Sequence, residues 1–358
     1  MSQTMSQRNE TQALDEQSNA SKTKATDMSS SPLEQLMTYL HDDMQAVNDT
    51  ILSEMHSDVP LIPQLASYLI ASGGKRIRPL LTLATARLVD ADIKQATLLA
   101  ATVEFIHTAT LLHDDVVDES QERRGQKAAN LVFGNQETVL VGDFLFSRAF
   151  QLMVKTNSVE ILRILSNASS VIAEGEVLQL QYQGDMSINW DVYKTIIGAK
   201  TASLFAASCE VNGAILKDKD IQKSLSEYGY NLGMAFQIAD DTLDYDANQE
   251  QLGKTVGDDF REGKITAPIL FALQNASDDE KAFWTRTLVE HNINDQDLKT
   301  AQDLILKHKG LEQSKQLARE YAQKSSQSIH KIIQKNDNNR ELFDMLCVMP
   351  EYVVSRLA

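Results

Sequence analysis

Residues 111–118 read LLHDDVVD, and residues 238–244 read IADDTLD. Each stretch carries the spacing Asp-Asp-x-x-Asp inside an apolar helical pattern, so the chain contains the same acidic motif twice. The aspartates of the two motifs are Asp114, Asp115, Asp118, Asp240, Asp241 and Asp244. On a helix the first and third aspartate share a face, and the middle one lies about 100° round. Because neighbouring carboxylates repel and aspartate is a poor residue for a helix interior, helix stability does not explain the motifs.

A hard divalent cation does explain the two acidic motifs. Mg²⁺ takes oxygen ligands and is usually held by a few carboxylates together with the phosphates of a substrate. A single triplet is equally well explained as a solvated acidic face, whereas two copies flanked by Leu, Ile and Val favour a metal site. Neither motif has the ligand spacing of a calcium-binding EF-hand loop. The sequence therefore predicts a magnesium site for a phosphorylated substrate.

Helical periodicity extends over most of the chain on either side of the two motifs. A capping box, Ser31-Pro32-Leu33-Glu34, opens the ordered region, and an apolar stripe follows it as far as Met55. Further helices are predicted over 62–71, 79–89, 92–119, 137–155, 158–183, 190–212, 218–246, 264–276, 278–290, 295–308, 311–335 and 339–357. No stretch alternates with the period of a strand. We expect an all-α fold, a single-domain helical bundle of about ten or more helices over residues 32–358.

The composition excludes several classes of protein. With 34 basic and 50 acidic side chains the net charge is −16, which argues against binding to nucleic acid. No apolar run approaches the roughly 18 residues of a transmembrane helix. Two cysteines, Cys209 and Cys347, cannot form a disulfide framework and indicate a reducing, cytoplasmic location. Residues 1–31 are polar, have no apolar signal segment and are predicted to form a disordered tail.

Cations suited to phosphate recognition lie close to both acidic motifs in the sequence. They are Lys75, Arg76 and Arg78 after a Gly-Gly turn, Arg123 and Arg124 after the first motif, and Lys254 and Lys264 after the second. His107 and His113 share the predicted helix of the first motif, and each alone is more typical of a core histidine than of a ligand. No zinc pattern, nucleophile elbow, Walker loop or dinucleotide fingerprint is present.

Taken together, these motifs resemble the trans-isoprenyl diphosphate synthase family. The resemblance is carried by Gly-Gly-Lys-x-x-Arg-Pro, by both acidic motifs, by Glu-Arg-Arg-Gly over 122–125 and by Phe-Gln before the second motif. Residues 104–115, 141–144, 173–179 and 257–259 are similar to the members that make octaprenyl diphosphate for bacterial ubiquinone and menaquinone side chains. The resemblance covers residues 33–357. It implies the isoprenoid synthase fold, usually a homodimer, with both acidic motifs facing a central cavity.

The resemblance also implies roles for individual residues. It assigns the six aspartates to about three Mg²⁺ ions that hold an allylic diphosphate, with Lys200 beside them in catalysis. The residues matching the isopentenyl diphosphate pocket are Lys75, Arg78, His107 and Arg124. Those matching the allylic site are Arg123, Lys200, Thr201, Gln237, Lys254 and Lys264. The implied reaction ionises an allylic diphosphate such as farnesyl diphosphate and adds isopentenyl diphosphate head to tail, repeatedly and without a protein nucleophile.

The length of the product is expected to depend on two small residues. Ala109 and Thr110 precede Asp114 by about one helical turn. Short-chain members of the family carry bulky aromatic residues there, which close the cavity. Small side chains therefore predict a long, octaprenyl product, although close helix packing is another explanation for them. The replacement Ala109→Tyr should shorten the product.

Three other functions stay open from the sequence alone. A nonaprenyl (solanesyl) diphosphate synthase would carry the same motifs. A class I terpene cyclase would carry a different second metal motif, and a non-catalytic regulatory subunit would lack an acidic motif or the basic pocket. The partners expected are the two diphosphate substrates, a second copy of the chain and, during release of an apolar product, a transient membrane contact.

Overall fold

The computed structural model describes residues 30–71, 74–123, 125–246, 256–333 and 339–357. Most of the predicted tail, residues 1–29, lies outside this part of the chain. The capping box is present: the Ser31 side chain accepts from the Glu34 N–H, and the Glu34 side chain accepts from the Ser31 N–H. It starts α2 (Pro32–Tyr39), and Leu40 separates this helix from α3 (His41–Glu54). The apolar stripe predicted for this region is thus divided between two helices.

Four central helices are buried almost all round. They are α5 (Ile77–Leu88), α6 (Ile93–Val117), α11 (Ser203–Leu216) and α12 (Lys219–Leu243). Glycine permits the closest approach between α11 and α12, because a Cβ atom on Gly229 would lie 2.3 Å from the Phe205 carbonyl oxygen. The helices α8 (Asn135–Lys155) and α9 (Val159–Tyr182) pack against α6 and α11, respectively, and α4 (Leu61–Ala71) packs against α8.

A π-helical turn interrupts the helix predicted over 190–212. It follows α10 (Trp190–Ile197), forms η1 (Gly198–Ala202) and continues directly into α11. Such turns are rare and frequently occur at functional sites. The predicted helix is therefore present and continues to Leu216, but apolar periodicity does not register the one extra residue in its π-helical turn.

One short hairpin corrects the prediction that the chain has no strand. β1 (Glu122–Arg123) pairs antiparallel with β2 (Gln126–Lys127), ahead of α7 (Ala129–Phe133). Gly125 has a φ of 74°, a conformation that glycine adopts without strain. Two-residue strands are too short for a period-2 pattern to be visible in the sequence.

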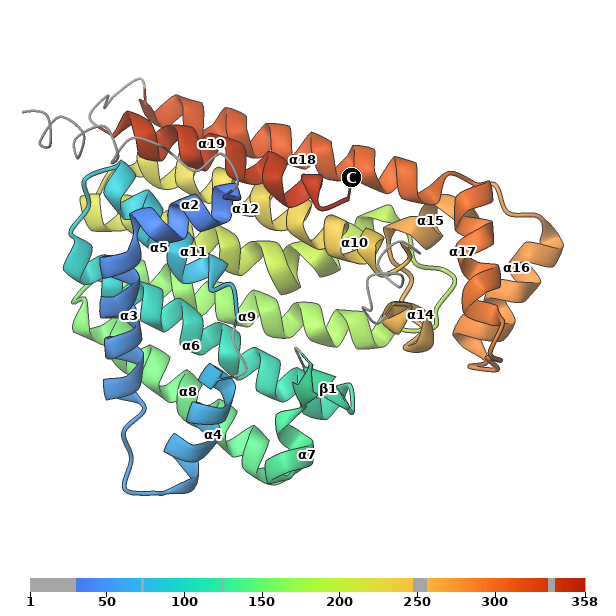
Figure 1. Ribbon diagram of the computed structural model, residues 1–358, viewed down its shortest axis with the longest axis horizontal. Helices are drawn as coiled ribbons and strands as arrows, with labels where there is room; N and C mark the ends of the chain where they lie inside the picture. The colour runs from blue at the N-terminus through green and yellow to red at the C-terminus, as the bar shows by residue number, and fades with distance from the viewer. Residues whose placement is uncertain (1–29, 72–73, 124, 247–255, 334–338, 358) are drawn as a thin grey trace, which may run out of the picture.

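The C-terminal segments complete the fold. They are α14 (Asp258–Arg261), α15 (Ala267–Leu273), α16 (Asp278–Trp284), η2 (Thr285–Val289), α17 (Asp297–Lys307), α18 (Gly310–Ile333) and α19 (Arg340–Ser355). In Figure 1, α18 and α19 run side by side along one edge over α12, while α4 and α7 lie at the opposite edge. None of the helices in the described residues has the length and apolarity needed to cross a membrane. The expected all-α fold is confirmed.

Candidate active site

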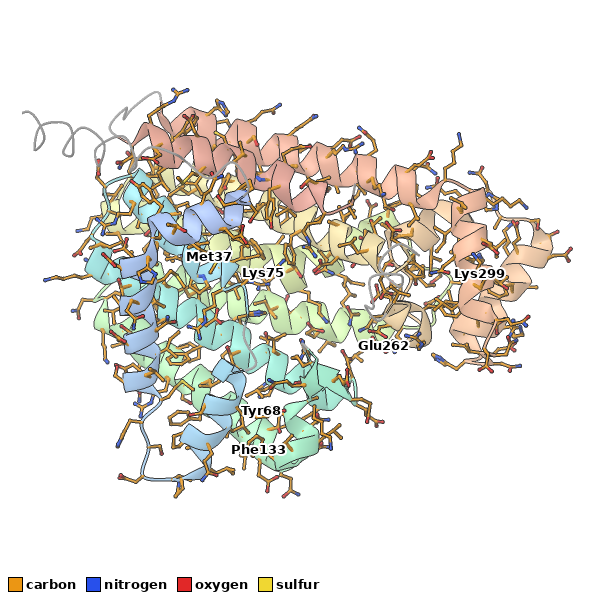
Figure 2. All side chains as sticks on the ribbon, in the orientation of Figure 1. Met37, Tyr68, Lys75, Phe133, Glu262 and Lys299 are labelled. Carbon is orange, nitrogen blue, oxygen red and sulfur yellow. The ribbon has the colours of Figure 1, made fainter. Side chains whose placement is uncertain are left out.

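A cavity of about 630 Å³ opens between α5, the C-terminal half of α6, α11, α12 and the end of the chain. Asp114 of the first motif and Asp240 of the second both line it, so the two motifs face one space. The predicted basic and polar residues that line it as well are Lys75, Arg78, His107, Arg123, Lys200, Thr201 and Gln237. In Figure 2, Lys75 lies in the middle of the molecule, away from the edges where Phe133 and Lys299 lie.

The first acidic motif ends α6 and is paired with cations from other segments. Asp115 is buried, and its Oδ1 accepts from the Arg123 Nε at 2.6 Å. Asp118 caps α6, and its Oδ2 lies 3.5 Å from the Lys264 Nζ. Burial raises the pKa of Asp114 to about 7; nearby carboxylates add to this rise, and Lys200 opposes it. The negative charge of this motif is therefore costly in the protein alone, and added cations stabilise it.

The second motif, at the end of α12, is held mainly by neutral donors. The two carboxylate oxygens of Asp241 accept from the Tyr193 hydroxyl and the Gln237 Nε2, each at 2.7 Å. Asp244 accepts three backbone N–H groups, from residues 257, 258 and 259, at 3.0–3.2 Å. Burial raises the pKa of Asp241 to about 6, despite these hydrogen bonds. Asp240 is the exception, because its Oδ1 lies 2.9 Å from the Arg356 guanidinium.

Arg78 and His107 line the basic side of the cavity and contact each other. The Arg78 Nη1 lies 3.1 Å from the His107 Nε2, and the guanidinium stacks 4.6 Å from the centre of the Phe205 ring. Lys75 is exposed at the mouth of the same cavity. The structure therefore brings together three of the four residues predicted to bind isopentenyl diphosphate. Arg124, the fourth, lies outside the described residues, as does Lys254 of the allylic set.

The π-helical turn η1 presents Lys200 and Thr201 to the cavity. The Lys200 Nζ lies 2.9 Å from the Glu176 carboxylate of α9, and the Thr201 hydroxyl donates to the Gln237 Oε1 at 2.7 Å. Lys264 contacts both Asp118 and Glu262. Burial disfavours its charged form, but these carboxylates outweigh burial and raise the pKa of Lys264. It remains a cation at the edge of the first motif.

Comparisons with known proteins agree with this geometry. The polyprenyl synthetase family model matches residues 59–305. The chain belongs to the polyprenyl synthetase family. It is 45% identical to octaprenyl diphosphate synthase of Escherichia coli over 82% of this chain and 91% of that one. It is 42% identical to the all-trans-nonaprenyl-diphosphate synthase of Rhodobacter capsulatus, over 69% and 76% of the two chains. The crystal structure of a decaprenyl diphosphate synthase from Rhodobacter capsulatus superimposes with a TM-score of 0.86 at 46% identity, covering 91% and 99%.

The carboxylates of this polyprenyl synthetase fit a divalent metal that is held jointly with a substrate. Within the described residues, no three His, Cys, Asp or Glu side chains converge closely enough to hold an ion by themselves. Mg²⁺ is commonly bound by one or two carboxylates, with substrate phosphates and water as its other ligands. Aspartates distributed around a shared cavity match that mode of binding, and members of the family use a divalent metal.

The two predicted chain-length residues occupy different places in the synthetase. Thr110 lines the cavity, whereas Ala109 is fully buried in the core and is not among the lining residues. Both face inward from α6, one turn before Asp114. Of the two, Thr110 is therefore the residue whose side chain borders the cavity.

Four further residues of the synthetase belong to the site although the sequence reasoning gave them no role. Glu104, Glu176 and Arg356 line the cavity, and the half-buried Asp259 lies near Asp241. Burial, followed by the charges of neighbouring aspartates, raises the pKa of Asp259 well above its ordinary value. Glu104, Glu176 and Asp259 lie within stretches that resemble the family, and this resemblance could have identified them as site residues. Arg356 had none, because only the packing of α19 brings the C-terminus to the cavity.

Proposed function

We propose that this chain is a long-chain all-trans polyprenyl diphosphate synthase that makes octaprenyl diphosphate for ubiquinone or menaquinone side chains. The observation that carries the proposal is one cavity with both acidic motifs and the Lys75, Arg78 and His107 group on its walls. Identity to octaprenyl diphosphate synthase over most of both chains supports the product. The nonaprenyl relative is nearly as similar, so nonaprenyl diphosphate is the second candidate.

Mg²⁺, in about three ions per site, would be held by the two acidic motifs and would neutralise the diphosphate of the allylic substrate as it departs. Lys200 and Arg123 line this cavity, Lys264 pairs with Asp118 of the first motif, and the three cations stabilise the negative charge that develops there. Arg78 and His107 hold the diphosphate of isopentenyl diphosphate on the opposite wall. Aromatic and aliphatic residues between the two ends exclude water from the allylic cation; they are Ile77, Leu111, Phe205 and Phe236.

A homodimer is the assembly proposed for the synthase. The helix α8 exposes three large apolar side chains on one face: Leu140 is 66%, Phe150 44% and Val154 63% accessible. Exposed apolar faces of this kind typically mark protein interfaces. The replacement Leu140→Asp should convert the dimer to a monomer in analytical ultracentrifugation. A wild-type protein that sediments as a monomer at micromolar concentration would contradict the assembly.

Product analysis by mass spectrometry tests the reaction. The purified protein would receive farnesyl diphosphate, excess isopentenyl diphosphate and Mg²⁺, with Asp114→Ala as the inactive control. An octaprenyl product supports the first proposal and a nonaprenyl product the second. An end point of four isoprene units would retain the reaction class but contradict the long-chain assignment, and no elongation of farnesyl diphosphate would favour a regulatory subunit. Hydrocarbon release without use of isopentenyl diphosphate would favour a terpene cyclase.

The chain-length residues can be tested in the same assay. Because Thr110 lines the cavity, Thr110→Tyr should block the path of the growing chain and shorten the product. Ala109→Tyr should also shorten it, with an additional loss of about 1–3 kcal/mol of stability, because its side chain must enter a packed core. An unchanged product from both variants would contradict the role given to this part of α6.

A further inference from the structure

A chain of three hydrogen bonds joins α10, η1 and α12 beneath the cavity. The Tyr193 hydroxyl donates to the Asp241 Oδ2, the Gln237 Nε2 donates to the Asp241 Oδ1, and the Thr201 hydroxyl donates to the Gln237 Oε1. All three distances are 2.7 Å. The chain is continuous from a buried tyrosine to a threonine that lines the substrate cavity.

The same hydrogen bonds attach the π-helical turn and the helix before it to α12. Tyr193 lies before η1 and Thr201 lies within it, while Gln237 and Asp241 are one turn apart on α12. The helix that carries Lys200 is therefore fastened to α12 once before its irregular turn and once within it. A π-helical turn is rare compared with an α-helical turn. Contacts from other helices therefore decide which of its side chains point toward the cavity. Lys200 is presented to the cavity from between these two attachments.

Tyr193 is suited to hold this arrangement. Its ring is buried and packs edge-on against Trp190, with the ring centres 5.8 Å apart. Its hydroxyl, protonated at neutral pH like that of any tyrosine, donates to the Asp241 carboxylate at 2.7 Å. Without that donor one oxygen of buried Asp241 would lose its partner, and the carboxylate could turn away from Gln237.

We infer that Tyr193 is a positioning residue: through Asp241 and Gln237 it sets the orientation of Thr201 and of the π-helical turn that carries Lys200. This role rests on the proposed prenyl transfer. Tyr193 lines a second, smaller cavity together with Lys200, Gln237 and Asp241, and it acts on the allylic end of the site only. The isopentenyl end, built from Arg78 and His107 on α5 and α6, does not depend on it.

The test compares Tyr193→Phe with Tyr228→Phe. Both tyrosines are buried, at 2% and 0% accessible, and both hydroxyls donate a single hydrogen bond that the phenylalanine removes. Tyr228 donates to the Leu346 carbonyl oxygen at 2.9 Å, between α12 and α19, and it does not line the cavity. It therefore reports the effect of losing a buried hydroxyl without disturbing the site.

Two readouts separate the positioning role from a structural one. In the elongation assay, Tyr193→Phe should lower kcat or raise the Mg²⁺ concentration for half activity by about 10–100-fold, with the KM for isopentenyl diphosphate nearly unchanged. In thermal denaturation, the rise in Tm on adding Mg²⁺ and inorganic pyrophosphate should shrink for Tyr193→Phe and persist for Tyr228→Phe. Adding Thr201→Val to Tyr193→Phe should cost less than the sum of the two, because both act in one chain.

The inference is overturned if Tyr193→Phe keeps the wild-type kcat and the wild-type rise in Tm. It is also overturned if Tyr228→Phe loses as much kcat as Tyr193→Phe, since a buried hydroxyl would then matter only for stability. A wild-type protein that binds Mg²⁺ and pyrophosphate but does not elongate farnesyl diphosphate would contradict the proposed function instead. The denaturation measurement needs no turnover, so it tests Tyr193 in either case.

Discussion

The two acidic motifs have the same spacing but are held by different kinds of partner. In the first, Asp115 and Asp118 are paired with Arg123 and Lys264, which come from other segments. In the second, Asp241 and Asp244 accept hydrogen bonds from a tyrosine, a glutamine and backbone N–H groups. If a metal ion replaces the cation beside a carboxylate, that cation is free to bind a diphosphate. A neutral hydrogen-bond donor stays on its carboxylate. The first motif is thus held by partners that can be exchanged, and the second motif by partners that are fixed.

Asp240 refines this comparison. It belongs to the second motif, yet it lines the cavity and is paired with the Arg356 guanidinium. Asp114 lines the cavity from the first motif. Each motif therefore presents its first aspartate to this cavity, and the two motifs differ in the partners of their other aspartates.

The largest effect is expected from removing the charge of a leading aspartate. Asp114→Asn keeps the shape of the side chain but removes a carboxylate that faces the cavity, and kcat should fall on the order of 10³-fold. Thermal stability in the absence of metal should not fall, because the buried charge is costly there. Asp295→Asn, on an exposed loop, is the control. Activity within tenfold of wild type would mean that the first motif does not bind the metal.

A smaller loss of kcat is expected on removing a cation that pairs with the first motif. Lys264→Ala removes the charge beside Asp118 and should lower kcat about 10²-fold. Lys299→Ala, an exposed lysine on α17 that pairs only with Asp303 in the described structure, should leave kcat unchanged. Equal kinetics for the two variants would break the comparison, because Lys264 would then be a surface charge like Lys299.

A replacement in the second motif should lower stability as well as activity. Asp241→Asn places an amide N–H opposite the donors from Tyr193 or Gln237, so one buried donor loses its acceptor. The free energy of unfolding should fall by about 1–3 kcal/mol in urea denaturation. Asp114→Asn should not show this loss. If the two variants are equally stable, the second motif is not the fixed side of the site.

A gradual effect is expected from pH. Burial raises the pKa of Asp114 to about 7 and that of Asp241 to about 6, so the folded protein without metal binds more protons than the unfolded chain between roughly pH 4 and 7. Its stability should therefore fall as pH rises through this range, by about 1.4 kcal/mol for each unit of pKa difference at most. Asp114→Asn should flatten the slope measured from pH 5 to 8. A slope that the variant leaves unchanged would assign the titration to other groups.

Much of the site was predictable because its chemistry is local. The Asp-Asp-x-x-Asp spacing fixes which carboxylates share a helix face, and the cations beside each motif follow from their position in the chain. The fold class followed from periodicity for the same reason. The π-helical turn and the hairpin are local features that leave no mark in the apolar period, and Arg356 reaches the cavity only through long-range packing, so none of the three was predictable in this way.

The sequence by itself determined the all-α architecture, the two acidic helix ends and the residues able to bind metal and diphosphate. Helix periodicity and charge spacing are properties of neighbouring residues, and these follow from the chain alone. Only the tertiary structure decided which partner each aspartate has, that Thr110 and not Ala109 lines the cavity, and that Tyr193 supports the second motif. Those facts depend on which helix faces pack together, and packing brings residues 193 and 241 within one hydrogen bond.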